Sequence, residues 1–266
     1  MVVSREQGIE ELTRFATEVI RQSGELALGY YGRGKPYIKF DEGLVTEAEI
    51  RVTDFFEKQI YEHFPEHQVF KNNQQNRGYT HKGNGALWVY DPFDGVANFQ
   101  AGIPVWGMSL ALLENFWPIL GVFYMPVTGD LFFAEAGKHA FRGKQPIHVY
   151  AQGNIDNESL LLTYSRFHQH CRATFPGKMR DLGCTAAHMC YVAMGRADAA
   201  VIANESYQDL AATSIIVEAA GGKIYKMDGK AFFLNDYLEG QQIDERLIVV
   251  APENYALVRR CIHPHN

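Results

Sequence analysis

The sequence predicts an α/β (α+β) protein made of two layered halves. Helical periodicity dominates the first 63 residues, short β-rich runs fill residues 85–150, and strand and helix patterns alternate from residue 158 onward. Alternation of that kind is typical of strands covered by helices. The segment near 145–155 has the composition of a connection. We therefore expect an N-terminal half over 1–150 and a C-terminal half over 151–266, packed as one unit.

Two helices are expected at the N-terminus. Residues 4–31 carry apolar side chains at helical spacing, and Ser4 is a suitable N-cap. The glycine in KFDEGL, residues 39–44, indicates a turn. A second helix is expected from Thr46 to about His63, where the sequence FPEH ends it.

The remaining elements are expected to be short and punctuated by Pro, Gly and Asn. In the N-terminal half, the expected strands are 86–90, 106–113, 118–125 and 130–136. In the C-terminal half, strands are expected at 159–163, 197–203 and 246–251, with helices at 184–194 and 209–220 and a terminal helix.

Composition excludes several classes of function. The 266 residues carry a net charge of −6 and scattered Lys and Arg, so no basic patch is available for a nucleic acid polymer. The chain has neither a run of 18 apolar residues nor an apolar leader, which predicts a cytoplasmic protein with no membrane partner. The four cysteines form no CxxC pair and are expected to be small buried hydrophobes in a reducing compartment.

Two carboxylates follow a buried-looking strand in the stretch WVYDPFDGVANF. Asp91 and Asp94 lie at the carboxyl end of that strand, where layered α/β sheets usually bind ligands. Carboxylate oxygens are hard ligands that suit Mg²⁺, and the residues from Gly95 to Asn98 can open a short helix whose amides face an anion. The alternative is a simple turn in which Asp91 or Asp94 caps the following helix.

A third carboxylate favours the metal site over the simple turn. Asp209 begins another apolar helix in SYQDLAATSIIVEAAGG, where its alternative role is again capping. Taken together with Asp91 and Asp94, it favours a three-carboxylate metal site next to an anion-binding helix end. Such a site suits a phosphate ester.

These motifs resemble those of the inositol monophosphatase family. DPFDGVANF resembles the family pattern D-P-[ILF]-D-G-T-x-N-F, and QDLAATSIIVEAAGG resembles W-D-x-A-A-x-x-x-I-x-x-E-A-G-G. LVTEAE, LGCTAAHMCYVAMGRADA and FRGKQPIHV match further segments, so the resemblance spans nearly the whole chain in order. It implies an αβαβα sandwich, a homodimer and two or three Mg²⁺ ions. It also implies hydrolysis of a small sugar, inositol or nucleotide phosphate by metal-activated water.

The resemblance assigns roles to individual residues. Asp91 would bridge two metals, and Asp94 and Asp209 would complete the second metal site. The carbonyl of Phe93 would ligate the first metal. The full sets are Asp91, Asp94, Thr46 and Glu49 as catalytic residues; Asp91, Phe93, Asp94, Asp209 and the position of Asn72 as metal ligands; and Gly95, Val96, Ala97, Thr185 and Asp209 as phosphate or substrate contacts.

Two departures from the family pattern affect the attacking water. The family glutamate that binds the first metal falls on Asn72, whose neutral amide cannot accept a proton. The family threonine after D-G is Val96. A catalytically impaired family member that binds a metal or a phosphorylated ligand therefore remains an alternative to an active phosphatase.

Three further positions differ from the family. The aspartate of T-E-A-D is Glu49, which also forms a possible capping box with Thr46. The tryptophan before Asp209 is Gln208. The glutamate that contacts inositol in many members falls near Ile202, so inositol recognition is not predicted from the sequence.

Overall fold

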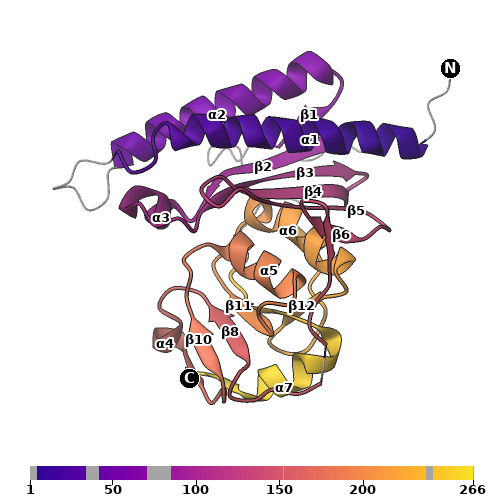
Figure 1. Cartoon of the computed structure of the whole chain (residues 1–266). Coiled ribbons are helices and arrows are strands. Elements are labelled where there is room, and N and C mark those ends of the chain that lie inside the picture. Colours follow the sequence, from indigo (N-terminus) through magenta and orange to yellow (C-terminus); the bar gives the residue numbers. More distant parts are fainter. Residues whose placement is uncertain (1–4, 34–41, 71–84, 152, 238–241, 266) are drawn as a thin grey trace.

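A computed structural model describes residues 5–33, 42–70, 85–151, 153–237 and 242–265. Figure 1 shows five layers: two N-terminal helices, a large sheet, a helical layer, a second sheet, and a short helix beneath it. This is the αβαβα sandwich that the sequence predicts. No helix in these ranges is long and apolar enough to cross a membrane.

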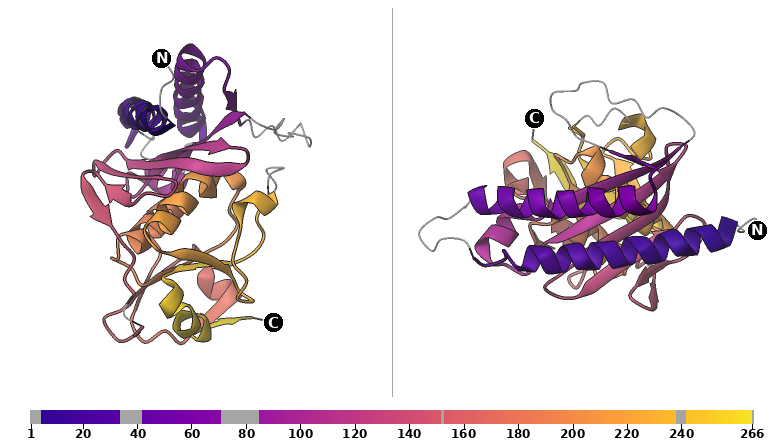
Figure 2. Two further views of the ribbon diagram at one scale, coloured as in Figure 1. Left: turned by 90° about the vertical axis from the view of Figure 1, so that its right-hand side faces the viewer. Right: turned by 90° about the horizontal axis from the view of Figure 1, so that it is seen from above.

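The first layer consists of α1 (Arg5–Leu28) and α2 (Glu42–His63), which lie side by side on the large sheet (Figure 2). The second helix begins at Glu42, inside the segment expected to be a turn, so the glycine in that segment does not interrupt the helix. Thr46 consequently lies within the helix and is not its N-cap. This rules out the capping box proposed for Thr46 and Glu49.

The large sheet has seven strands in sequence order. Its first pair is parallel and all others are antiparallel. Apolar side chains of one strand alternate between its two faces: Trp88 packs toward α1 and α2, whereas Leu87 and Val89 pack toward the helical layer. Because both faces are covered, the strands are almost continuously apolar. The strands are β1 (Gln68–Val69), β2 (Ala86–Asp94), β3 (Gly107–Glu114), β4 (Trp117–Met125), β5 (Asp130–Glu135), β6 (Ala140–Arg142) and β7 (Gln145–Ile147).

The middle layer consists of α5 (Thr185–Ala193) and α6 (Tyr207–Ala219), which pack between the two sheets (Figure 1). Both are apolar nearly all round, as expected for helices buried on two sides. The second sheet has the order β10-β8-β11-β13-β12. Its strands are β8 (Leu160–Thr163), β10 (Lys178–Arg180), β11 (Ala199–Ile202), β12 (Lys223–Lys226) and β13 (Leu247–Val250).

Short elements complete the chain. The terminal helix α7 (Tyr255–Arg260) lies under the second sheet, and β9 (Cys171–Ala173) pairs with β14 (Ile262–Pro264). The others are α3 (Val96–Ala101), α4 (Phe167–His170) and the single turns η1 (Leu234–Tyr237) and η2 (Pro252–Asn254). All four cysteines are free thiols; Cys171, Cys184 and Cys190 are buried as predicted, whereas Cys261 is only partly buried.

Candidate active site

The carboxyl end of β2 remains part of the sheet and contains a bulge, so it is not the simple turn that was the alternative for this segment. Pairing with β3 continues through Asp91 and resumes at Asp94, with an irregularity between them. The Phe93 amide donates to Asp91 Oδ1 at 3.1 Å within this bulge. A bulge changes the direction of neighbouring side chains, and here it leaves both aspartates half-buried at the edge of the sheet.

Asp94 connects the large sheet to the helical layer. Its carboxylate accepts hydrogen bonds from the first two amides of α5, those of Thr185, at 3.2 Å, and Ala186. The carboxylate therefore caps a helix, as one alternative proposed. That helix is the distant α5 and not α3, whose N-cap is Gly95. The interaction fixes a residue of the N-terminal half against the C-terminal half.

Asp209 belongs to a capping box at the start of α6. The Ser206 amide donates to Asp209 Oδ2 at 2.6 Å, while Ser206 Oγ accepts from the Asp209 amide. The capping role weighed for Asp209 is thus confirmed. Its neighbour Gln208, which replaces the family tryptophan, donates from Nε2 to the Tyr90 carbonyl at 3.0 Å. This bond holds the start of α6 against β2.

The sheet edge and the helix ends bring the predicted acids together. Burial, and then the negative charges of Asp209 and Asp94, raise the pKa of Asp91 well above its ordinary range. Glu49 adds a smaller repulsion from α2. Burial raises the pKa of Asp94 to about 6, even though two amide donors oppose the shift. No Lys or Arg in the described ranges is paired with these carboxylates, so they repel one another without compensation.

The donor set fits a divalent cation in chemistry and charge. Several half-buried carboxylates without a positive neighbour are stabilised by a metal ion, and oxygen ligands suit Mg²⁺. The side chains do not converge on a point: no group of three His, Cys, Asp or Glu in the described residues is arranged to hold an ion. Both oxygens of Asp94 and one of Asp209 are engaged by amides, which accounts for this arrangement. The set therefore fits a divalent cation by its charge and ligand chemistry, while helix-capping bonds hold the oxygens of Asp94 and Asp209.

The remaining predicted residues occupy different positions. Asn72 lies outside the described residues. Thr46 lies on α2 one turn before Glu49, and Glu49 is exposed. The Thr185 hydroxyl donates to Glu205 Oε1 at 2.8 Å and its amide to Asp94, so it is held in place at the pocket wall. Its contact with substrate stays a prediction.

Gly95 allows the chain to turn sharply after the acids. Its φ of 85° is a backbone conformation that favours glycine, and an added Cβ would come within 2.9 Å of the Val105 carbonyl. Val96 and Ala97 follow it and are exposed at the start of α3; their contact with phosphate stays a prediction. Asn98 fixes this segment by donating from Nδ2 to the carbonyls of Val105 and Leu182.

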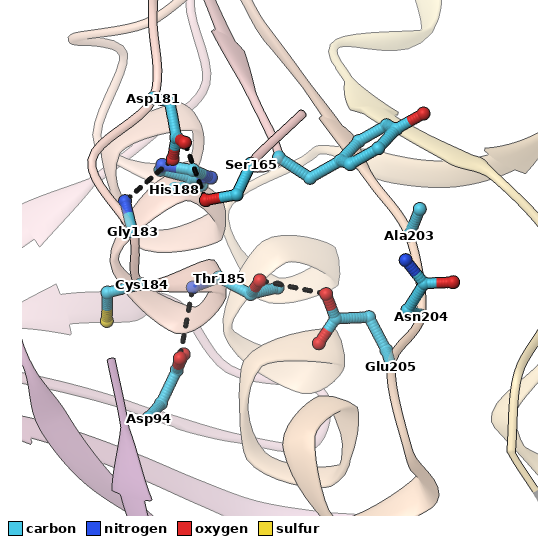
Figure 3. Close-up of a pocket in the computed structure, with 11 residues that line it drawn as sticks. Asp94, Ser165, Asp181, Gly183, Cys184, Thr185, His188, Ala203, Asn204 and Glu205 are labelled. Atoms are coloured by element: carbon cyan, nitrogen blue, oxygen red, sulfur yellow. Dashed lines mark hydrogen bonds between the residues drawn. The ribbon is translucent and has the colours of Figure 1, made fainter. Parts of the chain in front are cut away.

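A pocket of about 200 Å³ opens beside Asp94, and Figure 3 shows its lining. Sequence analysis did not identify most of its polar groups. Ser165 Oγ donates to Asp181 Oδ2 at 2.7 Å, and Glu205 projects from the loop before α6. Ile202, the position where a substrate glutamate was sought, is fully buried in β11. The acid that the sequence pattern did not reveal is Glu205, three residues later, between the end of β11 and the start of α6.

Solved structures with the same order of layers identify the fold. The Thermotoga maritima IMPase matches with a TM-score of 0.78 and 26% identity, covering 94% of this chain and 96% of that one. An inositol monophosphatase from Anabaena matches with a TM-score of 0.72 at 24% identity, covering 96% of each chain. The fold is therefore that of the inositol monophosphatase-type sandwiches.

Sequence comparisons identify the family. The model of the inositol monophosphatase family matches residues 9–262, so the chain belongs to that family. A histidinol-phosphatase from Chlorobaculum parvum is 31% identical over 227 residues, which is 82% of this chain and 86% of that protein. A fructose-1,6-bisphosphatase/inositol-1-monophosphatase from Thermotoga maritima is 29% identical and covers 90% of this chain and 95% of that protein. The relatives are named as phosphatases, consistent with a phosphoric monoester hydrolase.

Proposed function

We propose that this protein is a Mg²⁺-dependent hydrolase of small phosphate monoesters. The observation that carries the proposal is the group of mutually repelling carboxylates of Asp91, Asp94 and Asp209, brought together from β2 and α6 with no positive partner in the described residues. Family members are metal-dependent, which supports a cation at this position.

Asp91, Asp94 and Asp209 would hold the cation, and the Phe93 carbonyl would supply a further oxygen. When bound, Mg²⁺ would neutralise charge on the phosphate and lower the pKa of water. The chain's own contribution is position: the bulge orients Asp91, and the α5 amides hold Asp94 rigidly. The Gly95 and Val96 amides would hold the phosphate. In the reaction, water oxygen bonds to phosphorus as the ester P–O bond breaks, and the alcohol leaves with a proton.

The pocket beside Asp94 would receive the alcohol part of the ester. Relatives are named for histidinol phosphate, inositol phosphate and fructose bisphosphate, so these esters define the panel for testing. We expect phosphate release that depends on Mg²⁺ and falls by at least about 100-fold in Asp94→Asn, since one positioned catalytic group typically contributes that much. Release that is equal in the variant and in the wild type would refute the proposal.

A second candidate is a family member that binds ligand but turns over slowly. Val96, with no hydroxyl to contact an attacking water, stands exposed directly after Gly95 and favours this candidate. The neutral Asn72 adds to it from the sequence.

The double variant Asn72→Glu/Val96→Thr distinguishes the two candidates. If the family groups activate water, turnover with Mg²⁺ should rise by roughly 100-fold or more. The measurement is the steady-state kcat, with Val127→Thr, an exposed valine in the turn after β4, as the control for surface hydroxyl addition. An unchanged kcat in an active wild type would show that another group serves the water.

A further inference from the structure

The pocket beside Asp94 carries an excess of negative charge. Three carboxylates from three different segments line it: Asp94 from β2, Asp181 from the loop before α5, and Glu205 from the loop before α6 (Figure 3). None of its lining residues within the described ranges is Lys or Arg. The nearby guanidinium of Arg246 is directed at the Tyr164 hydroxyl, to which its Nε donates at 3.1 Å.

Internal hydrogen bonds satisfy only part of this charge. Glu205 is 7% exposed and accepts from the Thr185 hydroxyl through one oxygen. Burial, followed by the negative charges of Asp94 and Asp209, raises the pKa of Glu205 well above its ordinary range. Asp181 accepts from Ser165 Oγ and from the Gly183 amide, but it remains open to solvent. A carboxylate buried with one neutral donor is stabilised less than one paired with a cation.

His188 does not supply the missing positive charge. The Leu182 amide donates to its Nε2 at 3.0 Å, so the ring is neutral and carries its proton on Nδ1. Burial lowers the pKa of His188 to about 4, which agrees with the neutral form. The side chain is 1% exposed and its Nδ1 has no partner among the described atoms, so the pocket wall also contains an unused polar group.

We propose that the pocket formed by Asp94, Asp181 and Glu205 selects phosphate esters of small amino alcohols, with the ammonium group of the alcohol seated between Glu205 and Asp181. The proposal rests on the phosphatase activity proposed above, which places the scissile phosphate at the aspartate cluster. An ammonium donates three hydrogen bonds and offsets the carboxylate charge.

The same charges act against other ester classes. A second phosphate, as in a bisphosphate or a nucleotide bisphosphate, would enter beside the Asp181 and Glu205 carboxylates, which the proposed cation does not bind, and like charges at short distance are strongly unfavourable. A neutral polyol would form hydrogen bonds but leave the negative charge uncompensated. The pocket volume of about 200 Å³ further restricts the alcohol to a small one.

The test uses three esters that differ in one terminal group: 2-aminoethyl phosphate, 2-hydroxyethyl phosphate and 2-phosphoglycolate. With Mg²⁺ present, kcat/KM is expected to be at least 10-fold higher for the amine than for the hydroxyl ester, and lowest for the carboxylate. In Glu205→Gln the ratio of amine to hydroxyl ester should fall about 10- to 100-fold, the effect of one charge-assisted hydrogen bond. The exposed Glu253→Gln should keep the wild-type ratio.

Asp181→Asn provides a second variant, because Asp181 is exposed and its replacement does not disturb the core. It should lower the same ratio. Calorimetric binding of 2-aminoethyl phosphate with Mg²⁺ gives a readout that does not need turnover, and this binding should weaken in both variants. A wild type that prefers the hydroxyl or carboxylate ester, or variants with an unchanged ratio and unchanged binding, would overturn this inference. Absence of Asp94-dependent hydrolysis of every ester, with amine binding intact, would overturn the phosphatase proposal alone.

Discussion

The aspartates of the site each serve two purposes. Asp94 caps α5, Asp209 caps α6, and Asp91 accepts an amide bond in the bulge of β2. When each residue is considered alone in the sequence, capping and metal binding are competing interpretations of these aspartates. The structure makes them compatible, since a carboxylate has two oxygens with about four acceptor positions. Helix capping orients the acids, and their remaining charge is available to a ligand.

The carboxylates of Asp91 and Asp94, which have no cationic partner in the described residues, predict how the free energy of unfolding changes with pH. Below pH about 4, near the unperturbed pKa of Asp, the carboxyls are protonated in both folded and unfolded chains, and their burial costs little. As the pH rises toward 6, the unfolded chain releases the Asp94 proton first, because the folded pKa of Asp94 is raised to about 6. The free energy of unfolding contributed by this group therefore falls with rising pH. Asp91, whose pKa is also raised well above its ordinary range by burial and by its acidic neighbours, contributes in the same direction.

Asp91→Asn should consequently stabilise the metal-free protein at pH 7 by about 1–3 kcal/mol, as expected for removing one of three half-buried carboxylates that repel one another. At pH 4 the gain should disappear. Thermal unfolding in chelator at the two pH values measures it, with the exposed Asp244→Asn as control. Adding Mg²⁺ at pH 7 should raise Tm in the wild type and not in the variant. A variant less stable than the wild type in chelator at pH 7 would contradict this account of the acid cluster.

At the scale of elements, hydrophobic periodicity predicts the helices and strands that bury one face against a neighbouring layer. The long N-terminal helices and the strands β3, β4 and β5 were predicted within a few residues, because each must present apolar side chains to a neighbouring layer. Strands β10 and β12 were not predicted. Both strands are short and carry basic residues, as in KMR and KIYK, and their pairing depends on neighbours distant in sequence.

The packing of α6 against the large sheet was also not predictable from local sequence. Gly121 in β4 lies so close to α6 that an added Cβ would come within 2.3 Å of the Ala212 carbonyl. We expect Gly121→Ala to lower the free energy of unfolding by about 1–3 kcal/mol or more through overpacking. Urea denaturation measures this. Gly8→Ala in α1, which has open space around it, is the matched control and should be neutral or slightly stabilising. Equal stability of the two variants would mean that β4 and α6 can move apart at little cost to accommodate the added methyl group.

At the scale of the whole molecule, the site exists only where the two halves meet. Asp91 and Asp94 come from the large sheet, and Asp209, Thr185 and Glu205 come from segments more than 90 residues later. The family motifs indicated that these residues belong together, but spacing alone could not give their distances. One hydrophobic cluster also contains side chains from both halves, including Val89 from the large sheet and Ala212 from α6.

The shared core predicts that the halves unfold as one cooperative unit. The chain offers two independent reporters: Trp88, Trp106 and Trp117 all lie in the N-terminal half, and all four cysteines lie in the C-terminal half. Tryptophan fluorescence and the reactivity of the buried thiols, of which Cys184 and Cys190 lie at and within α5, should therefore show the same urea midpoint. Separating the halves would expose the faces of β2, β3 and β4 that α6 covers, together with the Asp94 bonds to α5, so we expect neither half to be stable alone. Thiols that react at a lower urea concentration than the fluorescence change would instead indicate a C-terminal half that opens first, and the site would then be lost before the large sheet unfolds.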